Sequence, residues 1–402
     1  MTACDVLVVG AGPAGSATAA VLANAGVRVR LVDRARFPRP KLCGDTLNPG
    51  AFAVLQQLET DSPVTGFCAR LRARALPIAG MTVSGPDGTA VTARYPSDVR
   101  GLSISRRELD LMLIERAARF GVDIVEGIRA VAPVVERGRV AGIRVEAAAP
   151  SEWRARVVII ADGRGSRLAS SLGLSQLARR PRRWAFGGCF SGVPTATGLG
   201  EMHLRNDGYI GVSPLPDGLT NVCVVRTLTA AAGRWCQQTI IPDTMAADPW
   251  LRDRFSSARP ESPVMSLGPL AVDAAGAGVP GALLAGDAAG FIDPMTGDGL
   301  RFALRGGVLA AQAALDELST GEPSFQWLDR QRQREFGNKW RFNRALRWMA
   351  GSPTALAAAS RLTARWPAPV RFIIREAGDV RRSLPPDIGE ADRHVRAHPG
   401  VW

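Results

Sequence analysis

Three clusters of glycine and acidic residues in this chain could hold a cofactor that carries phosphates. The first cluster is Gly10-Ala-Gly12-Pro-Ala-Gly15, and it is followed by Asp33. At this spacing the first glycine makes a tight turn, the second lets the backbone approach a pyrophosphate, and the third lets a helix pack on a strand. The N–H groups at the start of the helix favour anionic phosphates, and the Asp33 carboxylate can accept hydrogen bonds from a ribose diol. This cluster therefore predicts dinucleotide binding.

The other two clusters each follow an apolar run that is typical of a buried strand. Asp162 and Gly163 follow Val-Val-Ile-Ile-Ala, with a serine and an arginine just beyond them. Gly286 and Asp287 follow Ala-Leu-Leu-Ala. Each apolar run is therefore predicted to be a buried strand that runs directly into a turn with an acidic residue.

A turn rich in proline and glycine follows the third cluster and leads into a helix predicted over residues 299–318. It contains Gly297, Asp298 and Gly299. Its backbone N–H groups can point at developing negative charge, and the dipole of the following helix adds to the effect. Reduction of a flavin places charge near N1 and the C2 carbonyl, so this turn predicts a flavin site.

The first cluster lies in a complete strand–helix–strand unit: strands at residues 6–9 and 27–32 with a helix at residues 16–25 between them. The uncharged run at residues 6–27 could also be a membrane span or a signal peptide. No basic residue precedes it and the glycine turn interrupts it, so a folded nucleotide-binding unit is the better interpretation. No transmembrane helix is predicted.

The composition excludes several other classes of function. The chain has 402 residues and a formal net charge of +13, and its only lysines are Lys41 and Lys339. No basic run is interleaved with stacking aromatics, so no nucleic-acid partner is predicted; solvated arginines that attract anionic substrates, carriers or lipid headgroups explain the charge better. The six cysteines form no CxxC pair and the three histidines form no cluster with them. We therefore expect reduced thiols, a cytoplasmic location and no metal.

Two further regions could contact a ligand. Cys43 and Gly44 lie in a long loop punctuated by prolines, and such a loop after a Rossmann strand is unusual unless it covers a ligand. Cys43 could equally be a small buried side chain. Tyr209 and Pro214 flank a strand that could line a site on an antiparallel sheet, although an aromatic at such a position is more often part of the core.

The arginines that follow the second cluster form a solvated loop in the preferred interpretation, and a site for the phosphates of a nicotinamide cofactor in the alternative; they are Arg179, Arg180, Arg182 and Arg183. The C-terminal quarter is predicted to be helical and mixes arginine with aromatic residues. Its helices could lie on a membrane surface, although helices that cap their own domain are the more common case. A tail is predicted from about Pro385.

The three clusters, in this order and at this spacing, resemble the FAD-dependent superfamily that holds aromatic hydroxylases, flavin halogenases and geranylgeranyl reductases. The resemblance covers about residues 4–320. It implies an α/β fold (α+β overall): a Rossmann-like, three-layer ββα FAD-binding domain interleaved with an antiparallel-sheet substrate domain, then a helical C-terminal region. The implied domains are residues 1–66, 101–175 and 276–320 for FAD, residues 67–100 and 176–275 for substrate, and residues 321–402 for the C-terminal helices and tail.

The resemblance also implies a set of site residues. The first cluster would hold the FAD pyrophosphate, Asp33 and Arg34 would lie by the adenosine ribose, Asp287 would bind the ribityl chain, and Gly297 to Gly299 would flank the isoalloxazine. The implied cofactor-binding residues are Gly10, Gly12, Pro13, Ala14, Gly15, Asp33, Arg34, Cys43, Arg106, Val131, Asp162, Gly163, Gly286, Asp287, Gly297, Gly299 and Leu300. Cys43, Gly44 and Asp298 are the candidate catalytic residues beside the flavin, and Tyr209 and Pro214 are the candidate substrate residues.

Within the superfamily, Lys41-Leu-Cys43-Gly44-Asp45 and Pro294-Met-Thr-Gly297-Asp298-Gly299 most resemble the geranylgeranyl-reductase branch, although Gly211 stands where that branch usually carries a bulky aromatic. The predicted reaction is hydride transfer from NADPH or NADH to FAD and then to a C=C bond of a hydrophobic, prenyl or acyl substrate, free or carrier-bound. Two alternatives stay open. One is a monooxygenase that works through a C4a-hydroperoxyflavin, and the other is a flavin-binding partner protein without turnover. Halogenases are disfavoured because neither lysine matches their pattern. The oligomeric state is not predicted.

Overall fold

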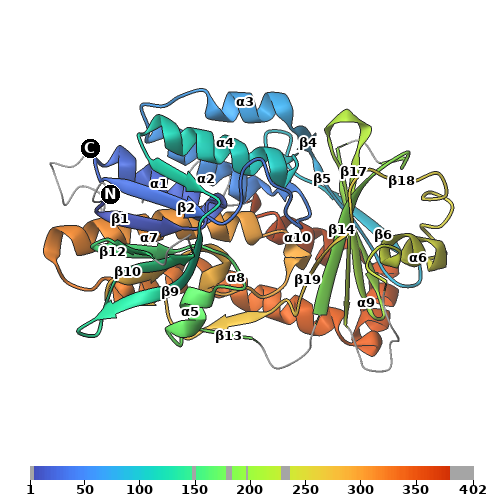
Figure 1. Ribbon diagram of the computed structural model, residues 1–402. Helices are drawn as coiled ribbons and strands as arrows, with labels where there is room; N and C mark the ends of the chain where they lie inside the picture. Colours follow the sequence, from blue (N-terminus) through green and yellow to red (C-terminus); the bar gives the residue numbers. More distant parts are fainter. Residues whose placement is uncertain (1–3, 147–150, 178–182, 196–197, 228–235, 381–402) are drawn as a thin grey trace.

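The computed structural model describes residues 4–146, 151–177, 183–195, 198–227 and 236–380. The predicted tail from about Pro385 and three of the four arginines named above (Arg179, Arg180 and Arg182) lie outside these ranges. Figure 1 shows two parts side by side: a nucleotide-binding part on the left, and on the right a part dominated by a long antiparallel sheet.

The nucleotide-binding part is built on a six-stranded sheet in the order β21-β22-β12-β1-β2-β8, in which β1 is parallel to both β12 and β2. Val6 and Val8 of β1 face a layer of helices, and Leu7 and Val9 face a three-stranded sheet in the order β11-β10-β9. This is the three-layer ββα arrangement that the sequence predicts. The strands of the large sheet are β1 (Val6–Val9), β2 (Val29–Asp33), β8 (Asp123–Glu126), β12 (Val157–Ile160), β21 (Gly278–Val279) and β22 (Ala282–Leu284). The strands of the small sheet are β9 (Arg129–Glu136), β10 (Arg139–Glu146) and β11 (Ser151–Arg154).

The helix layer consists mainly of α1 (Pro13–Asn24), α4 (Arg106–Arg119) and α7 (Gly299–Thr320). Small residues let α1 and α7 approach closely: a methyl group on Gly307 would lie 2.5 Å from the carbonyl oxygen of Ala14. A second apolar cluster joins this layer to α2 (Pro49–Thr60) and α3 (Phe67–Arg74). Therefore α3 packs with the nucleotide-binding part, although the sequence assigns residues 67–100 to the substrate domain.

The second part is an eight-stranded sheet in the order β18-β14-β17-β16-β15-β5-β6, with β19 also paired to β14. Alternate residues of its central strands point to opposite sides. Phe186, Ile210 and Val224 pack on the side of α6 (Ile240–Ala247), whereas Tyr209 and Val225 lie in a cluster on the other side with Leu42 from the loop after β2. The strands are β5 (Gly80–Ser84), β6 (Ala90–Arg94), β14 (Arg183–Ser191), β15 (Gly200–Arg205), β16 (Gly208–Pro214), β17 (Thr220–Thr227), β18 (Arg259–Pro260) and β19 (Met265–Leu267).

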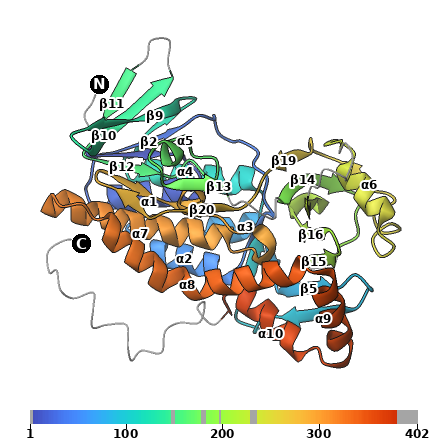
Figure 2. The same ribbon diagram turned by 90° about the horizontal axis from the view of Figure 1, so that it is seen from below.

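The C-terminal region is helical, as predicted, and consists of α8 (Phe325–Ala350), α9 (Pro353–Arg365) and α10 (Ala368–Ala377). Phe336 of α8 packs edge to face on Phe302 of α7, with ring centroids 5.0 Å apart. Figure 2 shows α8 running beneath the nucleotide-binding part, with α9 and α10 beside β5 and β15. In the described part of the chain, no helix is long and apolar enough to cross a membrane.

Short elements complete the described fold. A three-stranded sheet in the order β3-β7-β4 and a two-stranded sheet of β13 and β20 join the two parts. These elements are β3 (Thr46–Leu47), β4 (Leu76–Ile78), β7 (Gly101–Ser103), α5 (Arg167–Ser171), β13 (Ser175–Leu177), β20 (Val272–Ala274) and the 3-10 turns η1 (Pro216–Gly218), η2 (Gly286–Ala289) and η3 (Pro294–Thr296).

Candidate functional site

The glycine turn after β1 makes the contacts that its spacing requires. Gly10 has a φ of +100°, and a methyl group there would lie 2.4 Å from the carbonyl oxygen of Ala161. A methyl group on Gly15 would lie 1.8 Å from the carbonyl oxygen of Gly10, so α1 can start here only with glycine at both positions. Gly12 is different, because the nearest atoms to a methyl group there are guanidinium nitrogens of Arg39 at 3.8 Å and of Arg106 at 4.0 Å. The Gly12 backbone therefore faces two cations across open space.

Asp33 ends β2 beside this turn. Its carboxylate accepts hydrogen bonds from the backbone N–H groups of Ala11 and Ala35, each at 2.8 Å, so it also stabilises the turn. Arg34 is exposed, and Val131 is half-buried on β9. These positions are compatible with the predicted adenosine end of a dinucleotide.

Arg106 begins α4 and is held by a buried ion pair. Its guanidinium donates to both carboxylate oxygens of Asp110, at 2.7 and 2.8 Å, and Asp110 is fully buried. Arg39 approaches the same carboxylate at 3.3 Å. Burial by itself lowers the pKa of Arg106, but the Asp110 carboxylate more than offsets it and the pKa is raised. Burial lowers the pKa of Arg39, and the Asp110 carboxylate opposes this shift. Both guanidinium groups therefore lie beside Gly12 with one carboxylate between them.

The loop at residues 39–45, here called the strap, crosses from β2 to the antiparallel sheet. Asp45 ends it with a φ of +52°, and its carboxylate accepts from the Arg106 backbone N–H at 3.1 Å and from the Asn221 side-chain amide at 2.7 Å. Burial raises the pKa of Asp45 to about 7. Burial also raises the pKa of Cys43, although nearby Arg106 opposes this. The Cys223 thiol donates to the Cys43 carbonyl at 3.2 Å, which fixes the strap on β17.

Asp162 follows β12. Its Oδ1 atom is buried and has no hydrogen-bond partner among the described residues, and burial raises its pKa to about 6. Gly163 has a φ of +90°, and a methyl group there would lie 3.6 Å from Lys41 Nζ. A buried carboxylate oxygen without a donor indicates that a hydrogen-bonding group belongs beside it.

Gly286 packs against the start of α1, where a methyl group would lie 2.8 Å from the Ala14 side chain. Asp287 is half-buried, and its carboxylate makes no hydrogen bond with any described residue. Burial lowers the pKa of Lys41 and of Arg164, and the Asp287 carboxylate opposes this in both cases, so its charge lies near both cations. Asp287 also lines a cavity of about 190 Å³. It is a carboxylate available to hydroxyl groups of a ligand.

Asp298 holds the turn before α7 in place. Its carboxylate accepts from Asn48 at 3.1 Å and from Asn343 at 3.0 Å, and Lys339 Nζ lies 3.3 Å away. Burial raises the pKa of Asp298 to about 6, although Lys339 opposes this. The turn is therefore anchored to α2 and α8 by a buried polar network. Leu300 anchors its other end by packing in the apolar core.

Four glycines have no close neighbour at the point where a side chain would start. A methyl group on Gly44, Gly297 or Gly299 would meet no atom within 4 Å, and one on Gly211 would meet only the Cys223 carbonyl, at 4.0 Å. Gly44 and Gly297 are exposed, whereas Asp298 between the last two glycines is buried. The backbone of the turn before α7 is thus not covered by other side chains at Gly297 and Gly299, and their predicted place beside a flavin stays a prediction.

The two candidate substrate residues have different surroundings. Tyr209 is buried, and its hydroxyl donates to Asp293 at 2.5 Å. Asp293 also accepts from Arg183 at 3.1 Å, so both side chains anchor the loop that leads to Gly297. Pro214 is buried at the end of β16. Tyr209 therefore supports the loop that leads to Gly297. This is the structural role that the sequence analysis gave as the alternative to a substrate contact.

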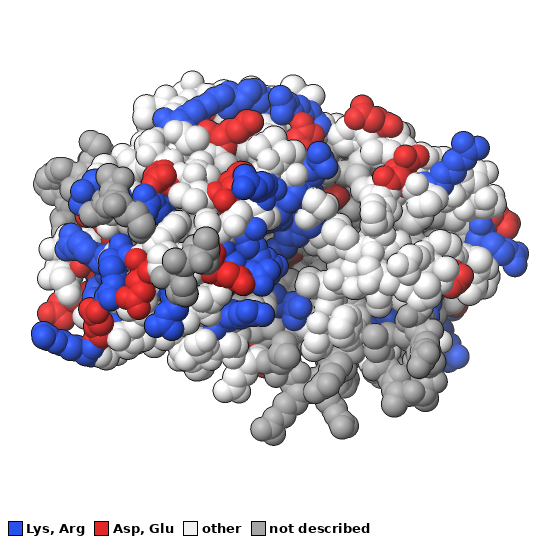
Figure 3. Space-filling model, viewed as in Figure 1, with Lys and Arg blue, Asp and Glu red and all other residues white. Residues whose placement is uncertain are grey.

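The arrangement fits FAD. Open backbone at Gly12 beside Arg39 and Arg106 suits a pyrophosphate, the Asp287 carboxylate suits ribityl hydroxyls, and the unpartnered Asp162 oxygen suits a hydrogen-bond donor. In the space-filling view, basic side chains gather along the boundary between the two parts (Figure 3). No group of three or more histidine, cysteine or acidic side chains among the described residues could hold a metal ion.

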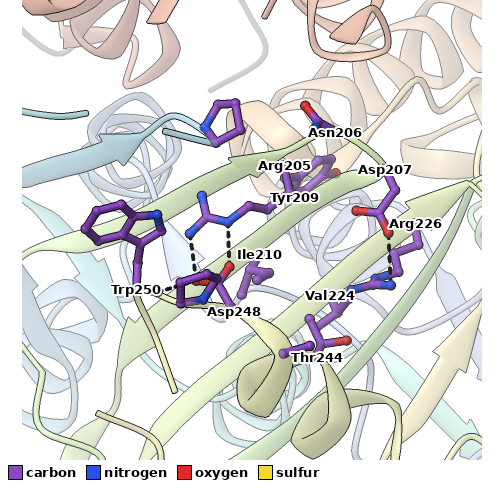
Figure 4. A pocket seen from close by; sticks show the side chains of 13 residues that line it. Arg205, Asn206, Asp207, Tyr209, Ile210, Val224, Arg226, Thr244, Asp248 and Trp250 are labelled. Carbon is purple, nitrogen blue, oxygen red and sulfur yellow. Dashed lines mark hydrogen bonds and ion pairs between the residues drawn. The ribbon is translucent and has the colours of Figure 1, made fainter. Parts of the chain in front are cut away.

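A second hollow of about 250 Å³ lies on the α6 side of the antiparallel sheet (Figure 4). The charged residues that line it form ion pairs with one another. Arg205 binds Asp248 through two hydrogen bonds of 2.5 and 3.1 Å, and Arg226 lies 2.9 Å from Asp207. None of the residues of the three glycine clusters lines it. Of the candidate site residues, only Tyr209 lines it, so the predicted cofactor-binding residues lie elsewhere.

Sequence reasoning missed several residues that build this site. Arg39 and Asp110 carry no motif of their own, and Asp110 could have been found only as the residue four positions after Arg106 on one helix face. Lys339 lies far along the chain, yet α8 brings it to Asp298. Its charged group also contacts Asp379 at 3.1 Å and the Ala377 carbonyl at 3.2 Å.

Comparisons with known proteins agree with this geometry. A family model described as an FAD-binding domain matches residues 3–335. Digeranylgeranylglycerophospholipid reductase of Methanoculleus marisnigri is 30% identical over 337 residues, which cover 80% of this chain and 78% of the relative. Menaquinone reductase of Mycobacterium tuberculosis is 31% identical over 328 residues, which cover 77% of this chain and 76% of the relative.

Two solved structures show the same fold. A geranylgeranyl bacteriochlorophyll reductase-like protein from Thermoplasma acidophilum superposes with a TM-score of 0.74 at 23% identity, covering 94% of this chain and 100% of the other. The myxobacterial chondrochloren halogenase superposes with a TM-score of 0.78 at 22% identity, covering 96% of this chain and 99% of the other. At these identities the likeness concerns the fold alone.

Proposed function

Because the chain belongs to the FAD-binding-domain family and is an FAD-dependent oxidoreductase, we propose that it uses NADPH or NADH to reduce a C=C bond in a hydrophobic lipid that carries isoprenoid chains. Membership of the FAD-binding family confirms the sequence prediction of an FAD enzyme. The proposed reaction rests on one observation: the two relatives above, each matched over more than three quarters of its length, are named as reductases of such lipids.

When bound, FAD would supply the hydride-transfer chemistry, from a reduced nicotinamide to a substrate carbon. The chain's own residues would supply orientation and charge. Gly12 would let the α1 N-terminus approach the pyrophosphate, and Arg39 and Arg106 would balance its charge. Asp287 would accept hydrogen bonds from the ribityl hydroxyls. The N–H groups at Gly297 and Gly299 would stabilise negative charge on the reduced ring.

Reduction of a C=C bond needs a proton as well as a hydride, and Cys43 is the proposed donor. Its pKa is raised by burial, so the thiol keeps its proton at neutral pH. The strap places Cys43 beside Gly44, where a methyl group would meet no atom within 4 Å, and the Cys43 carbonyl is held against Cys223 of β17. The thiol would give its proton to the carbon next to the one that receives the hydride, and the thiolate would be reprotonated from solvent. The nearby Arg106 stabilises that thiolate.

The test is an anaerobic assay with NADPH and a geranylgeranyl-bearing phospholipid in detergent. The proposal predicts a product that is heavier by two hydrogens for each reduced bond. Cys43→Ala should keep its FAD but lose most of the turnover, whereas the exposed Cys236→Ala should match the wild type. A product heavier by one oxygen, formed only in air, would instead identify a monooxygenase. Bound FAD that NADPH cannot reduce with any candidate substrate would identify a partner protein without turnover.

A further inference from the structure

The outer surface of the C-terminal helices carries the largest exposed apolar side chains of this region. Trp348 is 75% exposed, Trp366 61%, Leu362 60% and Phe372 52%. Trp348 lies on α8, Leu362 on α9 and Phe372 on α10, and Trp366 directly follows α9. The three helices follow one another in the chain and contact one another in sequence order. Exposed large apolar groups gathered in one region indicate an interaction surface.

The same helices carry a stretch of positive charge that contains no acidic residue. Between residues 340 and 375 the sequence has no aspartate or glutamate and has seven arginines. One of them, Arg347, points inward to Asp293 at 3.8 Å. The other six are exposed; they are Arg341, Arg344, Arg361, Arg365, Arg371 and Arg375. These six arginines and the four apolar residues are here called the docking patch.

We propose that the docking patch binds the surface of an anionic phospholipid bilayer. Helices with arginine on one side and tryptophan, phenylalanine or leucine beside it are typical of proteins that lie in the membrane interface. The absence of acidic residues from this stretch matches a negatively charged partner. The inward sides of the helices are already used: Phe336 and Lys339 of α8, Leu356 of α9 and Ile374 of α10 are buried.

The patch adjoins the cavity beside Asp287. Trp340 and Arg344 of α8 line that cavity, and Trp348 follows Arg344 by four residues, which places it on the same side of the helix. Arg344 is 61% exposed and lies 4.0 Å from Asp273 at the cavity rim. A lipid leaving the bilayer at Trp348 would therefore meet this opening first. This link to the substrate rests on the proposed function, whereas the docking itself does not.

The experiment uses the full-length protein loaded with FAD. It is floated through a density gradient with vesicles of phosphatidylcholine alone or of phosphatidylcholine mixed with phosphatidylglycerol, without substrate or turnover. The proposal predicts binding to the mixed vesicles that weakens at high salt. An arginine near an anionic surface contributes about fivefold in partitioning, so Arg361→Glu with Arg365→Glu should weaken binding by about 25-fold or more. Leu362→Ala with Trp366→Ala should weaken it by about tenfold or more.

Matched controls separate the patch from general surface effects. Arg252→Glu replaces an arginine that is 64% exposed, and Trp250→Ala replaces a tryptophan that is 58% exposed, both outside the patch. Neither should change binding. Equal binding of all variants to the mixed vesicles would overturn the proposal, as would equal losses in the controls.

Three further outcomes would also overturn it. One is a wild-type protein that binds neither kind of vesicle. Another is dimerisation that depends on Trp366, with no vesicle binding. The third is a chain ending at Val380 that loses binding while the patch variants keep it. Vesicle binding without any reductase activity would overturn the proposed function but not the docking.

Discussion

Arg106 and Arg39 both contact the Asp110 carboxylate, and both are also expected to bind the FAD pyrophosphate. Changing Asp110 should therefore affect stability and cofactor binding together. Asp110→Asn keeps the size of the side chain but removes its charge. Two hydrogen bonds of 2.7 and 2.8 Å lose their charge assistance, and the fully buried carboxylate that also faces Arg39 at 3.3 Å is neutralised. Breaking a buried pair by removing one partner costs about 3–5 kcal/mol, so we expect the flavin-free variant to lose that much free energy of unfolding.

FAD should recover much of this loss. Both guanidinium groups lie beside Gly12, with nitrogens 3.8 and 4.0 Å from a methyl group placed on it, at the turn where the pyrophosphate is predicted to bind. The pyrophosphate can therefore supply the negative charge that the substituted side chain lacks. We expect FAD to stabilise the variant more than the wild type.

The assay is urea unfolding, followed by circular dichroism, of flavin-free and FAD-saturated protein. The control is Asp5→Asn, because Asp5 makes the same bidentate contact with Arg28 at the surface, where the arginine is 66% exposed. Exposed pairs contribute little, so this variant should resemble the wild type. An unchanged stability of flavin-free Asp110→Asn would refute the buried-pair argument. An equal gain from FAD in both proteins would refute the shared-cation argument.

Three further predictions concern single positions. Asp287→Ala should purify with little FAD because the ribityl hydroxyls lose their acceptor, whereas Asp273→Ala, on the exposed rim of the same cavity, should keep its flavin; absorbance of the purified proteins measures this. Burial raises the Asp45 pKa from 3.8 to about 7, so the folded state binds this proton more tightly and stability should fall as the pH rises from about 4 to 7, by about 4 kcal/mol. Urea unfolding across this range should show that fall for the wild type and a flatter profile for Asp45→Asn. Gly307→Ala should destabilise by about 1–3 kcal/mol because its methyl group meets α1, whereas Gly337→Ala, with nothing within 4 Å, should stabilise by about 0.5–1 kcal/mol; thermal melts compare the pair.

The parts of the site that follow from local rules could be predicted from the sequence. The glycine turn is such a part, because a strand, a tight turn and a helix start specify Gly10 and Gly15 within a few residues of each other. The pairing of Asp33 with that turn also follows from the length of one strand–helix–strand unit. The sequence could not show that Arg39 and Arg106 share Asp110, since their meeting depends on the path of the strap. Nor could it place Lys339 beside Asp298, because nothing local to α8 indicates where that helix packs.

The position of Lys339 also bears on how much of the chain the cofactor site requires. The family match ends at residue 335, yet Asp298 is held by Asn343 and Lys339 of α8, and Lys339 is in turn fixed by Asp379 and by the carbonyl of Ala377, the last residue of α10. Without α8 the buried Asp298 carboxylate would keep Asn48 but lose the Lys339 charge and the Asn343 amide, which is costly enough to displace the turn that it anchors. The turn before α7 and the C-terminal helices are therefore one structural unit. Removing α8–α10 should weaken the cofactor site even though no residue of α9 or α10 is part of it.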